Sequence, residues 1–568
     1  MEVLRLSSLL LILLLWFSAT DQVNSAVNGG AGCAVCVALT GIMDQLAILH
    51  DSSIQEEFDR LCDLIPEGIF NTACKNAMGE FAPVITELYE ELGSIDLACH
   101  SLGICFVEPE EGFCHLYPLP ESRRFYHHSN SRRLAEFRQK FGSRIEICDL
   151  PGFKEICEAI ERLSNNLPFS DVDGDKFSTV APLRGSDWRG KDCNDNSATV
   201  YPGRIPENGD AESDSNCNGI YGVDEETGFT YEDELCGGQA NLGIMILGDS
   251  AGAHFHIPKE WLTPSLINKE AFSYLPYILA NEFDFPMTSS ATGYKNITAP
   301  IIDGTTDSVY LRMLDRNRCI HRDFQNIARN GGKSSNLMRF TPTLARNQEE
   351  DNPLFVMLSI IGNDVCNGRK DTLSGMTTPE QMKERLLETL AYLDDTIPAG
   401  SHVILTGLVD GRVLYDNLYD RIHPLGEVRQ DATYEDLYEY LNCLQLSPCT
   451  GWMNANETLR DLTSQRAAEL DVAISEVANG GQYNNFDMIY FDFPAVEVME
   501  EWEAEHGPNT AWQLIEIVDG FHPSQLGQKA FAAKIWEILE RDFPHVLGEI
   551  NPNNQRIIQL FGDQGGYE

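Results

Sequence analysis

The sequence is poor in basic side chains. Its 568 residues include 41 lysines and arginines against 87 aspartates and glutamates, which gives a formal net charge of −46 at pH 7. Such an excess of carboxylates repels a polyphosphate, so the composition argues against nucleic acid as a ligand. For the same reason, binding to an anionic membrane or lipid requires a local basic patch or a bridging cation.

Long apolar runs are lacking as well. The run Leu6–Phe17, broken only by Ser7 and Ser8, is too short to span a bilayer, and no other stretch comes close. Arg5 precedes this run, and small polar residues follow it. The pattern predicts a secretory signal peptide over residues 1–25, with an uncleaved anchor as the alternative.

Cysteines, in contrast, are plentiful. The chain has 16, an even number that suits disulfides in an oxidising compartment. Sequons at Asn296 and Asn456 predict N-glycosylation and also indicate export. We therefore expect a secreted glycoprotein that works outside the cell or in endolysosomal vesicles. The length allows two to four domains and a core large enough for an enzyme.

Amphipathic helical patterns separate the first six cysteines. Within Cys36–Leu49 and Phe81–Leu92 the apolar side chains recur at roughly helical spacing. The combination resembles a saposin B-type domain over residues 29–110. The resemblance implies a small all-α domain that opens to handle lipids, although a bundle that merely covers another domain would show the same pattern. It also implies the disulfides Cys33–Cys105, Cys36–Cys99 and Cys62–Cys74.

Residues 111–147 are predicted to be a linker. From Pro118 to Arg144, basic and polar side chains with paired arginines show no apolar period, so proteolytic processing here is a reasonable hypothesis. Cys114 lies just before this stretch. If Cys114 pairs with Cys443 or Cys449, the two parts of the chain stay joined after cleavage.

Residues 148–235 are predicted to be a calcium-binding acidic segment, because short acidic and amide side chains with glycines are dense between Asp171 and Glu225. Oxygen atoms at alternate positions can converge on one cation, and glycine permits the sharp turn between them, as in twelve-residue calcium loops. A solvated, turn-rich loop is the alternative. Three clusters favour structural calcium, and short separations suggest the disulfides Cys148–Cys157 and Cys193–Cys217. The expected ligands are Asp171, Asp173 and Asp175, then Asp192, Asn194 and Asp195, and finally Asp214, Asn216, Asn218, Ile220, Asp224 and Glu225.

Residues 236–568 alternate strand-length apolar runs with helical patterns. This alternation predicts a mostly parallel sheet with helices on both faces, an αβα sandwich whose ligand site lies beyond the carboxyl ends of the strands. The expected strands are Leu242–Leu247, Leu354–Ile361, His402–Leu408 and Phe486–Phe493, and the clearest helices are Glu380–Leu393 and Pro523–Leu539.

Three short motifs in this domain contain the residue types that ester hydrolysis needs. They are Gly-Asp-Ser ending at Ser250, Gly-Asn-Asp around Asn363, and Asp-Gly-Phe-His from Asp519 to His522. A serine nucleophile needs a histidine base, and the histidine needs an acid that orients its ring. The Ser250 amide and the Asn363 side chain are candidate oxyanion donors. Each motif alone is an ordinary turn or cap, but together they indicate a serine esterase.

The motif set resembles the GDSL/SGNH hydrolases, with Ser250, Asn363 and His522 at three of the four signature positions. The resemblance implies that a glycine amide completes the oxyanion hole, and we place it at Gly331, with Gly332 as the rival. The chain departs from the family in having Ala251 where the name motif has leucine, and in a long insert after the nucleophile.

Residues 248–252 also match the nucleophile elbow of the α/β-hydrolases. In that family the acid normally comes from a separate strand, whereas here Asp519 lies three residues before His522. The Gly-Asn-Asp motif has no role there either, so the SGNH resemblance is the better one. His254 and His256 stay outside the predicted triad, because packed histidines are equally expected.

The arrangement of the whole chain resembles a family of saposin-bearing esterases that remove secondary fatty acyl chains from the lipid A of bacterial lipopolysaccharide. The resemblance implies that reaction here, through an acyl-enzyme on Ser250, and a precursor cut into two disulfide-linked subunits. It also implies lipopolysaccharide or a related acyl lipid as the partner, with lipid-transfer proteins or a membrane surface as further ones. A general phospholipase or lysophospholipase and a non-catalytic lipid-binding protein are the alternatives.

Overall fold

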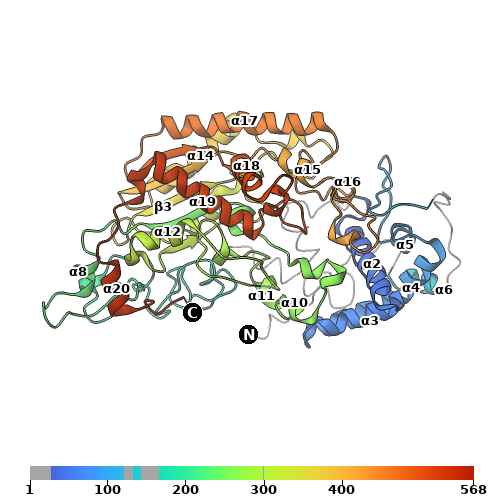
Figure 1. Cartoon of the computed structure of the whole chain (residues 1–568), viewed down its shortest axis with the longest axis horizontal. Coiled ribbons are helices and arrows are strands. Elements are labelled where there is room, and N and C mark those ends of the chain that lie inside the picture. The colour runs from blue at the N-terminus through green and yellow to red at the C-terminus, as the bar shows by residue number, and fades with distance from the viewer. Residues whose placement is uncertain (1–26, 121–131, 142–165, 299, 568) are drawn as a thin grey trace.

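The computed structural model describes residues 27–120, 132–141, 166–298 and 300–567. The predicted signal peptide and the predicted pair Cys148–Cys157 lie outside these ranges, as does most of the predicted processing segment. The described chain forms a helical N-terminal domain beside a larger domain built on a sheet (Figure 1).

The N-terminal domain is all helical. Disulfides join Cys33 to Cys105, Cys36 to Cys99 and Cys62 to Cys74, the pairing that the saposin resemblance implies. Five of these cysteines are almost completely buried in the apolar core, so the covalent bonds form its centre. The helices are α2 (Gly30–His50), α3 (Ile54–Leu64), α4 (Ile69–Leu92) and α5 (Ile95–Leu102).

The expectation that no stretch after Phe17 is apolar enough to span a membrane is wrong, because helix α2 is long and apolar enough. The segment Val27–His50 passes that test with a mean hydropathy of 1.8, but 83% of its window is buried inside the protein. Two disulfides start from this helix, at Cys33 and Cys36. Its apolar character is therefore that of a core helix in a small domain.

The predicted linker contains a helix that its polar sequence did not indicate. Helix α6 (Arg132–Phe141) packs on α4 through Leu134 and Phe137, which are 3% and 5% exposed. An ion pair between Lys140 and Glu80, 2.7 Å apart, adds to the contact. Two apolar side chains three positions apart suffice for one face of a short helix, but they are too few to show as a period.

The larger domain contains one five-stranded parallel sheet in the order β2-β1-β3-β4-β5. One row across it runs Asn326, Ile246, Met357, Ile404 and Ile489. The edge strand β2 was not predicted, because three residues carry too little pattern. The strands are β1 (Gly243–Gly248), β2 (Phe324–Asn326), β3 (Leu354–Ser359), β4 (Ser401–Thr406) and β5 (Phe486–Phe491).

Helices cover both faces of this sheet, so the αβα sandwich is confirmed. Helices α14 and α17 pack together on one face, and α12 and α19 contact each other on the other (Figure 1). The longer helices are α12 (Val309–Arg316), α14 (Pro379–Asp394), α16 (Tyr434–Cys443), α17 (Glu457–Gly480), α18 (Ala495–His506), α19 (Gln525–Asp542) and α20 (Asn554–Phe561). The shorter ones are α8 (Tyr231–Leu235), α9 (Ser250–Ala253), α10 (Lys269–Ser273), α11 (Leu275–Ala280), α13 (Leu337–Phe340) and α15 (Arg412–Leu418).

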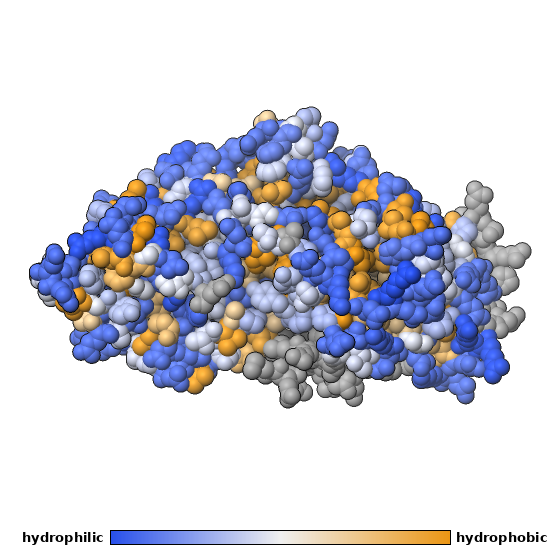
Figure 2. Space-filling view, turned by 60° about the horizontal axis from the view of Figure 1, so that its bottom comes forward, coloured by the Kyte–Doolittle hydropathy of each residue, from blue (hydrophilic) through white to orange (hydrophobic). Residues whose placement is uncertain are grey.

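A continuous apolar cluster joins the two domains. It runs from the saposin-like helices through side chains such as Trp261, Phe272 and Phe285 to Leu437 and Leu441 of α16. The surface in Figure 2 is mostly hydrophilic, and apolar residues gather near the place where the two domains meet. The domains are thus packed against each other through a shared core.

The Cys114–Cys443 disulfide adds a covalent link between the two domains, which settles the choice between Cys443 and Cys449. Cys449 instead pairs with Cys366, and Cys236 pairs with Cys319. Both of these pairs are separated by 83 residues in the sequence. Separations of that size give no local signal, so the sequence did not reveal them.

Candidate active site

Ser250 lies just beyond the carboxyl end of strand β1, which is flanked by β2 and β3 in the sheet. Asp249 caps the short helix α9, and Ser250 is its first residue. The serine is 6% exposed, and its position beyond the strand end is where ligand sites form on parallel sheets. The Ser250 amide precedes the first hydrogen bond of the helix, so it has no acceptor within α9.

His522 connects Ser250 with Asp519. The His522 Nε2 atom lies 2.8 Å from Ser250 Oγ, and its Nδ1 atom lies 2.6 Å from Asp519 Oδ2. Because the carboxylate accepts, Nδ1 carries the proton and Nε2 is left to accept from the serine hydroxyl. Asp519 Oδ1 also accepts the amide of His522 at 3.0 Å, which fixes the carboxylate from the main chain. The three groups form a complete nucleophile–base–acid chain.

The Arg329–Gly332 turn lies beside the nucleophile. The Gly332 amide donates to Arg329 O at 2.9 Å, whereas no acceptor among the described residues lies within hydrogen-bonding distance of the Gly331 amide. Gly331 has a φ of +70°, which favours glycine. This arrangement favours Gly331 over Gly332 as the oxyanion donor.

Gly332 has a different role in the same turn. A Cβ atom at this position would lie 2.7 Å from the carbonyl oxygen of Gly248, at the end of β1. The Gly332 carbonyl accepts a hydrogen bond from Asn363 Nδ2 at 3.1 Å. The turn therefore joins the nucleophile strand to Asn363, the third predicted oxyanion residue.

Asp249 is a positioning residue that the sequence did not reveal. Its carboxylate accepts the amide of Ala251 at 3.0 Å and the amide of Ile361 at 2.9 Å. Ile361 follows β3 in the loop that carries Asn363, so one side chain ties together the two loops around the oxyanion site. Burial raises the pKa of Asp249 to about 6, against the lowering effect of these amide bonds.

An apolar cavity of about 70 Å³ opens beside Ser250 and His522. Loops that follow β1, β3, β4 and β5 contribute to its wall, as expected for the carboxyl edge of the sheet. A cavity with few polar groups and a nucleophile at its rim suits an acyl chain. Its apolar lining includes Val409, Val413, Leu414, Trp452, Phe493, Met499, Ile515, Phe521 and Phe531.

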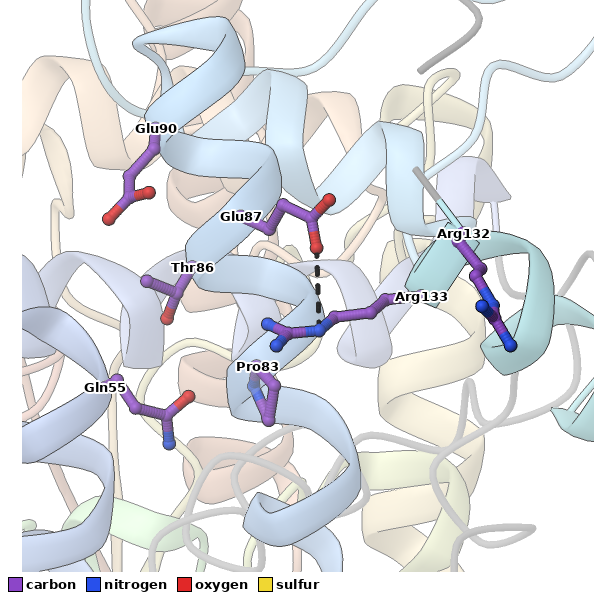
Figure 3. A pocket seen from close by; sticks show the side chains of 7 residues that line it. All are labelled: Gln55, Pro83, Thr86, Glu87, Glu90, Arg132 and Arg133. Atoms are coloured by element: carbon purple, nitrogen blue, oxygen red, sulfur yellow. Dashed lines mark ion pairs between the residues drawn. The ribbon is translucent and has the colours of Figure 1, made fainter. Parts of the chain in front are cut away.

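A second cavity, of about 610 Å³, lies on the saposin-like domain between α3, α4 and α6. Figure 3 shows that Arg133 reaches across it toward Glu87, 3.8 Å away, while Arg132 points away from Glu87. Charged and polar side chains form most of this wall, and its described lining residues include no nucleophile with a base. The smaller cavity is therefore the better candidate for the chemistry.

His254 and His256 are both internal. His254 is fully buried, and its Nδ1 atom lies 2.6 Å from Thr288 Oγ1. His256 lies between Glu516, at 2.7 Å, and the carbonyl oxygen of Ile301, at 2.6 Å. These contacts agree with packed, hydrogen-bonded histidines.

The first two predicted calcium clusters form one site. Carboxylate oxygens of Asp171, Asp173 and Asp195 lie within 4.8 Å of one another, as do those of Asp173, Asp175 and Asp192. One oxygen each of Asp173, Asp175 and Asp192 is buried without a hydrogen-bond donor. Burial and the neighbouring acids raise the pKa of Asp175 to about 7. Such orphaned oxygens fit a divalent cation.

Asn194 contributes its main chain rather than its amide to this cluster. Its backbone N–H donates to Asp192 Oδ1 at 2.7 Å and so fixes the turn between the acids. The side chain of Cys193, next to it, is bonded to Cys217, which holds the cluster against the third predicted loop.

The third loop differs from the predicted ligand set. Its predicted closing residue Glu225 is exposed, and Asp224 pairs with Arg556 at 2.8 Å. Glu232 lies there instead and accepts from the amides of Asn216 and Asn218 at 3.0 and 3.1 Å. The chain turns back at residues 224–230, so the glutamate that approaches the loop comes from α8.

Asp214 and Ile220 complete the description of this loop. Asp214 accepts the amides of Asn218 and Gly219 at 3.1 and 2.8 Å, and Ile220 is fully buried. Both predicted glycosylation sites, Asn296 and Asn456, are exposed.

Comparison with known proteins agrees with this architecture. Residues 32–158 match the family model "Saposin-like domain", and residues 244–535 match "GDSL-like Lipase/Acylhydrolase". Rabbit (Oryctolagus cuniculus) acyloxyacyl hydrolase is 46% identical over 541 residues, covering 94% of this chain and 93% of its own. The human protein of that name is 43% identical over 575 residues, covering 100% and 99%, and the mouse protein is 44% identical over 569 residues, covering 98% of each.

The relatives cover nearly the whole chain, including both domains and the segment between them. The GDSL match spans Ser250 and His522, the two groups that approach to 2.8 Å in the structure. The protein is thus a carboxylic ester hydrolase and belongs to the acyloxyacyl hydrolase family.

Proposed function

We propose that this protein cleaves acyloxyacyl esters and releases the secondary fatty acyl chains of lipid A in bacterial lipopolysaccharide. The observation that carries the proposal is the 2.8 Å contact between Ser250 Oγ and His522 Nε2 at the rim of an apolar cavity. The whole-chain similarity to acyloxyacyl hydrolases supports the choice of substrate.

The first half of the reaction transfers the acyl group to the enzyme. Ser250 Oγ attacks the carbonyl carbon of the ester while His522 Nε2 takes the hydroxyl proton, and Asp519 stabilises the resulting imidazolium. The amides of Ser250 and Gly331 and the side chain of Asn363 stabilise the oxyanion, each donor by about 3 kcal/mol. His522 then gives its proton to the departing 3-hydroxyl of the primary chain.

The second half releases the fatty acid. A water molecule gives a proton to His522 and attacks the acyl-enzyme carbonyl, and a second oxyanion forms in the same site. When it collapses, the Ser250 oxygen recovers the proton from His522. The secondary fatty acid leaves, and the apolar cavity that held its chain is free for another substrate.

The saposin-like domain would hold the acyl chains that are not being cleaved. Its helix α2 ends with the exposed side chains Ile48 and Leu49, and contacts the short helix Pro264–Leu266 of the larger domain. The same domain carries the basic residues of α6, on a chain that is otherwise strongly acidic. The apolar side chains would bind acyl chains of the lipid, and the basic ones would bind its phosphate groups.

Three further properties belong to the proposal. Calcium bound by the Asp171–Asp195 cluster would stabilise the acidic segment, because the orphaned oxygens there need a cation. Secretion to the extracellular space or endolysosomal vesicles is supported by the disulfides. Cleavage within the linker would leave two subunits joined through Cys114 and Cys443.

The test is fatty-acid release measured by mass spectrometry, from purified lipopolysaccharide and from phosphatidylcholine, at acidic and neutral pH. We expect selective loss of secondary acyl chains from lipopolysaccharide. Ser250→Ala should lower the rate by about 10⁴-fold or more while the protein stays folded. Release from phosphatidylcholine alone would show a phospholipase, and activity retained in Ser250→Ala would overturn the assignment of the nucleophile.

A further inference from the structure

The loop that carries Asp519 and His522 is held by three side chains from another part of the domain. Tyr434 Oη donates to the carbonyl oxygen of Ile517 at 2.5 Å, and Tyr438 Oη donates to that of Gly520 at 2.7 Å. Between them, His423 Nε2 lies 2.9 Å from the carbonyl oxygen of Val518. Three carbonyls within four residues, on both sides of Asp519, are therefore fixed from outside the loop.

These three hydrogen bonds are well protected. The side chains of His423, Tyr434 and Tyr438 are at most 3% exposed. The Nδ1 atom of His423 accepts the amide of Leu425 at 3.2 Å, so Nε2 carries the proton and donates. Burial lowers the pKa of His423 to about 4, which keeps the ring in this neutral state above that pH.

Close packing accompanies the hydrogen bonds. Gly520 has a φ of +60°, and a Cβ atom there would lie 2.6 Å from Tyr438 Oη and 2.9 Å from the ring of Tyr434. The loop thus rests directly on α16. A rotation of α16 would move the backbone on both sides of Asp519.

The saposin-like domain docks on the same stretch of chain, residues 423–443. Gln45 of α2 donates to the carbonyl oxygen of Leu425, and its Oε1 atom accepts the amide of Val428 at 2.8 Å. Asp44 pairs with Arg429, whose Nη2 atom lies 2.9 Å from Asp44 Oδ1.

Further contacts lie at both ends of residues 423–443. At the first end Tyr117 Oη also donates to Leu425 O, at 3.0 Å, and at the second Tyr440 Oη lies 3.3 Å from Cys33 Sγ. The Cys114–Cys443 disulfide closes the last turn of α16. One face of residues 423–443 therefore contacts the saposin-like domain, and the other contacts the loop of Asp519 and His522.

We infer that Tyr434, Tyr438 and His423 are positioning residues for His522, and that docking of the saposin-like domain on residues 423–443 raises the turnover rate itself. His522 must stay within hydrogen-bonding distance of Ser250 through both halves of the reaction, and a displacement of about 1 Å can cost about 100-fold in rate. The inference deepens the proposed function, because it concerns the same catalytic site and is independent of which lipid enters.

The first experiment removes one hydroxyl at a time. Tyr438→Phe and Tyr434→Phe are assayed with p-nitrophenyl butyrate, an ester too small to need lipid presentation. We expect kcat to fall about 10-fold with an unchanged KM, and the pH profile of kcat/KM to shift, because His522 is displaced. Tyr415→Phe is the matched control, since its hydroxyl contacts Glu435 of α16 and not the loop.

The second experiment acts from the saposin side. Gln45→Met keeps the length of the side chain but removes both hydrogen bonds to residues 425 and 428. We expect kcat for p-nitrophenyl butyrate to fall about threefold or more, whereas Gln55→Met, on α3 of the same domain, leaves it unchanged. Circular dichroism and the melting temperature show whether each variant is folded. If Tyr438→Phe fails to fold, the inference is tested with Tyr434→Phe and Gln45→Met alone.

The outcomes separate the inference from the proposed function. If kcat on the small ester stays at the wild-type value in the folded tyrosine variants and in Gln45→Met, the inference is wrong. If instead the variants behave as expected but wild type releases nothing from lipopolysaccharide, the substrate assignment fails while the positioning role stands.

Discussion

In the saposin-like domain, cystines lie at the centre of the core, whereas in the catalytic domain the centre is a sheet. The Cys33–Cys105 and Cys36–Cys99 bonds are buried among the helices of a small domain that contains no sheet. Strands β1, β3 and β4 are buried on both faces along most of their length. A domain of fewer than about 80 residues buries too little apolar surface to be stable on that alone.

The two domains also differ in what their buried carboxylates do. In the catalytic domain, Asp249 and Asp519 hold the reacting groups in place through main-chain amides and His522. In the saposin-like domain, Asp44 and Asp96 accept hydrogen bonds from residues that follow the domain in the chain. These four buried carboxylates thus serve the reacting groups in one domain and contacts between segments of the chain in the other.

Disulfide removal should give the largest difference between the domains. Cys36 and Cys99 are 63 residues apart, so the double change Cys36→Ala/Cys99→Ala should destabilise the small domain by about 4 kcal/mol. Because that is most of the free energy of unfolding of a domain of this size, we expect its helices to be no longer cooperatively folded at 37 °C. Thermal unfolding followed by circular dichroism and by hydrogen exchange measures this.

The matched comparison is Cys366→Ala/Cys449→Ala in the catalytic domain. This pair closes a longer loop of 83 residues, yet the sheet core should keep the domain folded with a lower melting temperature. Loss of folding in the catalytic variant, with the saposin variant intact, would reverse the comparison.

The pH dependence of stability should come next. Asp96 is fully buried, and its oxygens accept the amides of Leu116 and Tyr117 at 2.9 and 3.1 Å. Burial raises its pKa from 3.8 to about 7 in spite of these bonds. Because the folded state binds the proton more tightly, the contribution of Asp96 to stability is largest at acidic pH and falls as pH rises toward 7. Between pH 5 and 8 this contribution of Asp96 to the free energy of unfolding should fall by about 3 kcal/mol.

Urea unfolding of the saposin-like helices at several pH values measures this slope. Asp96→Asn has no proton to lose, so its slope should be flatter than that of the wild type over the same range. An equal slope in both proteins would mean that Asp96 is not its source.

The smallest effect concerns the acidic segment between the domains. If calcium binds the Asp171–Asp195 cluster, chelation with EDTA should lower the melting temperature, because the free energy of unfolding falls by about 2.7 kcal/mol where the free ion had been at 100 times its Kd. Asp173→Asn should reduce that loss, and Glu212→Gln, an exposed acid of the same segment, should not. A melting temperature unaffected by EDTA would contradict the calcium assignment.

Features with a local pattern could be predicted from the sequence. Ser250, Asn363, Asp519 and His522 each follow an apolar run or open a helical one, and four of the five strands have runs of six residues. The topology rule for parallel sheets then brings the first two together. The spacing of the first six cysteines resembles that of saposin-like domains, and this resemblance made their pairing predictable.

Features that depend on distant contacts could not be predicted. Glu232 reaches the third acidic loop only because residues 224–230 turn back, and α6 is helical because Leu134 and Phe137 meet α4. Asp249 has a role because Ile361, more than a hundred residues later, presents its amide. In each case packing between distant segments determines the structure, and the local sequence pattern does not indicate it.

The separation of Ser250 and His522 along the chain has a consequence for biosynthesis. The two residues are 272 positions apart, so the base leaves the ribosome long after the nucleophile. While the protein is being made, its saposin-like helices and its nucleophile are already present before the base that activates the serine. The growing chain is therefore unable to hydrolyse an ester until residues 516–522 fold against α16.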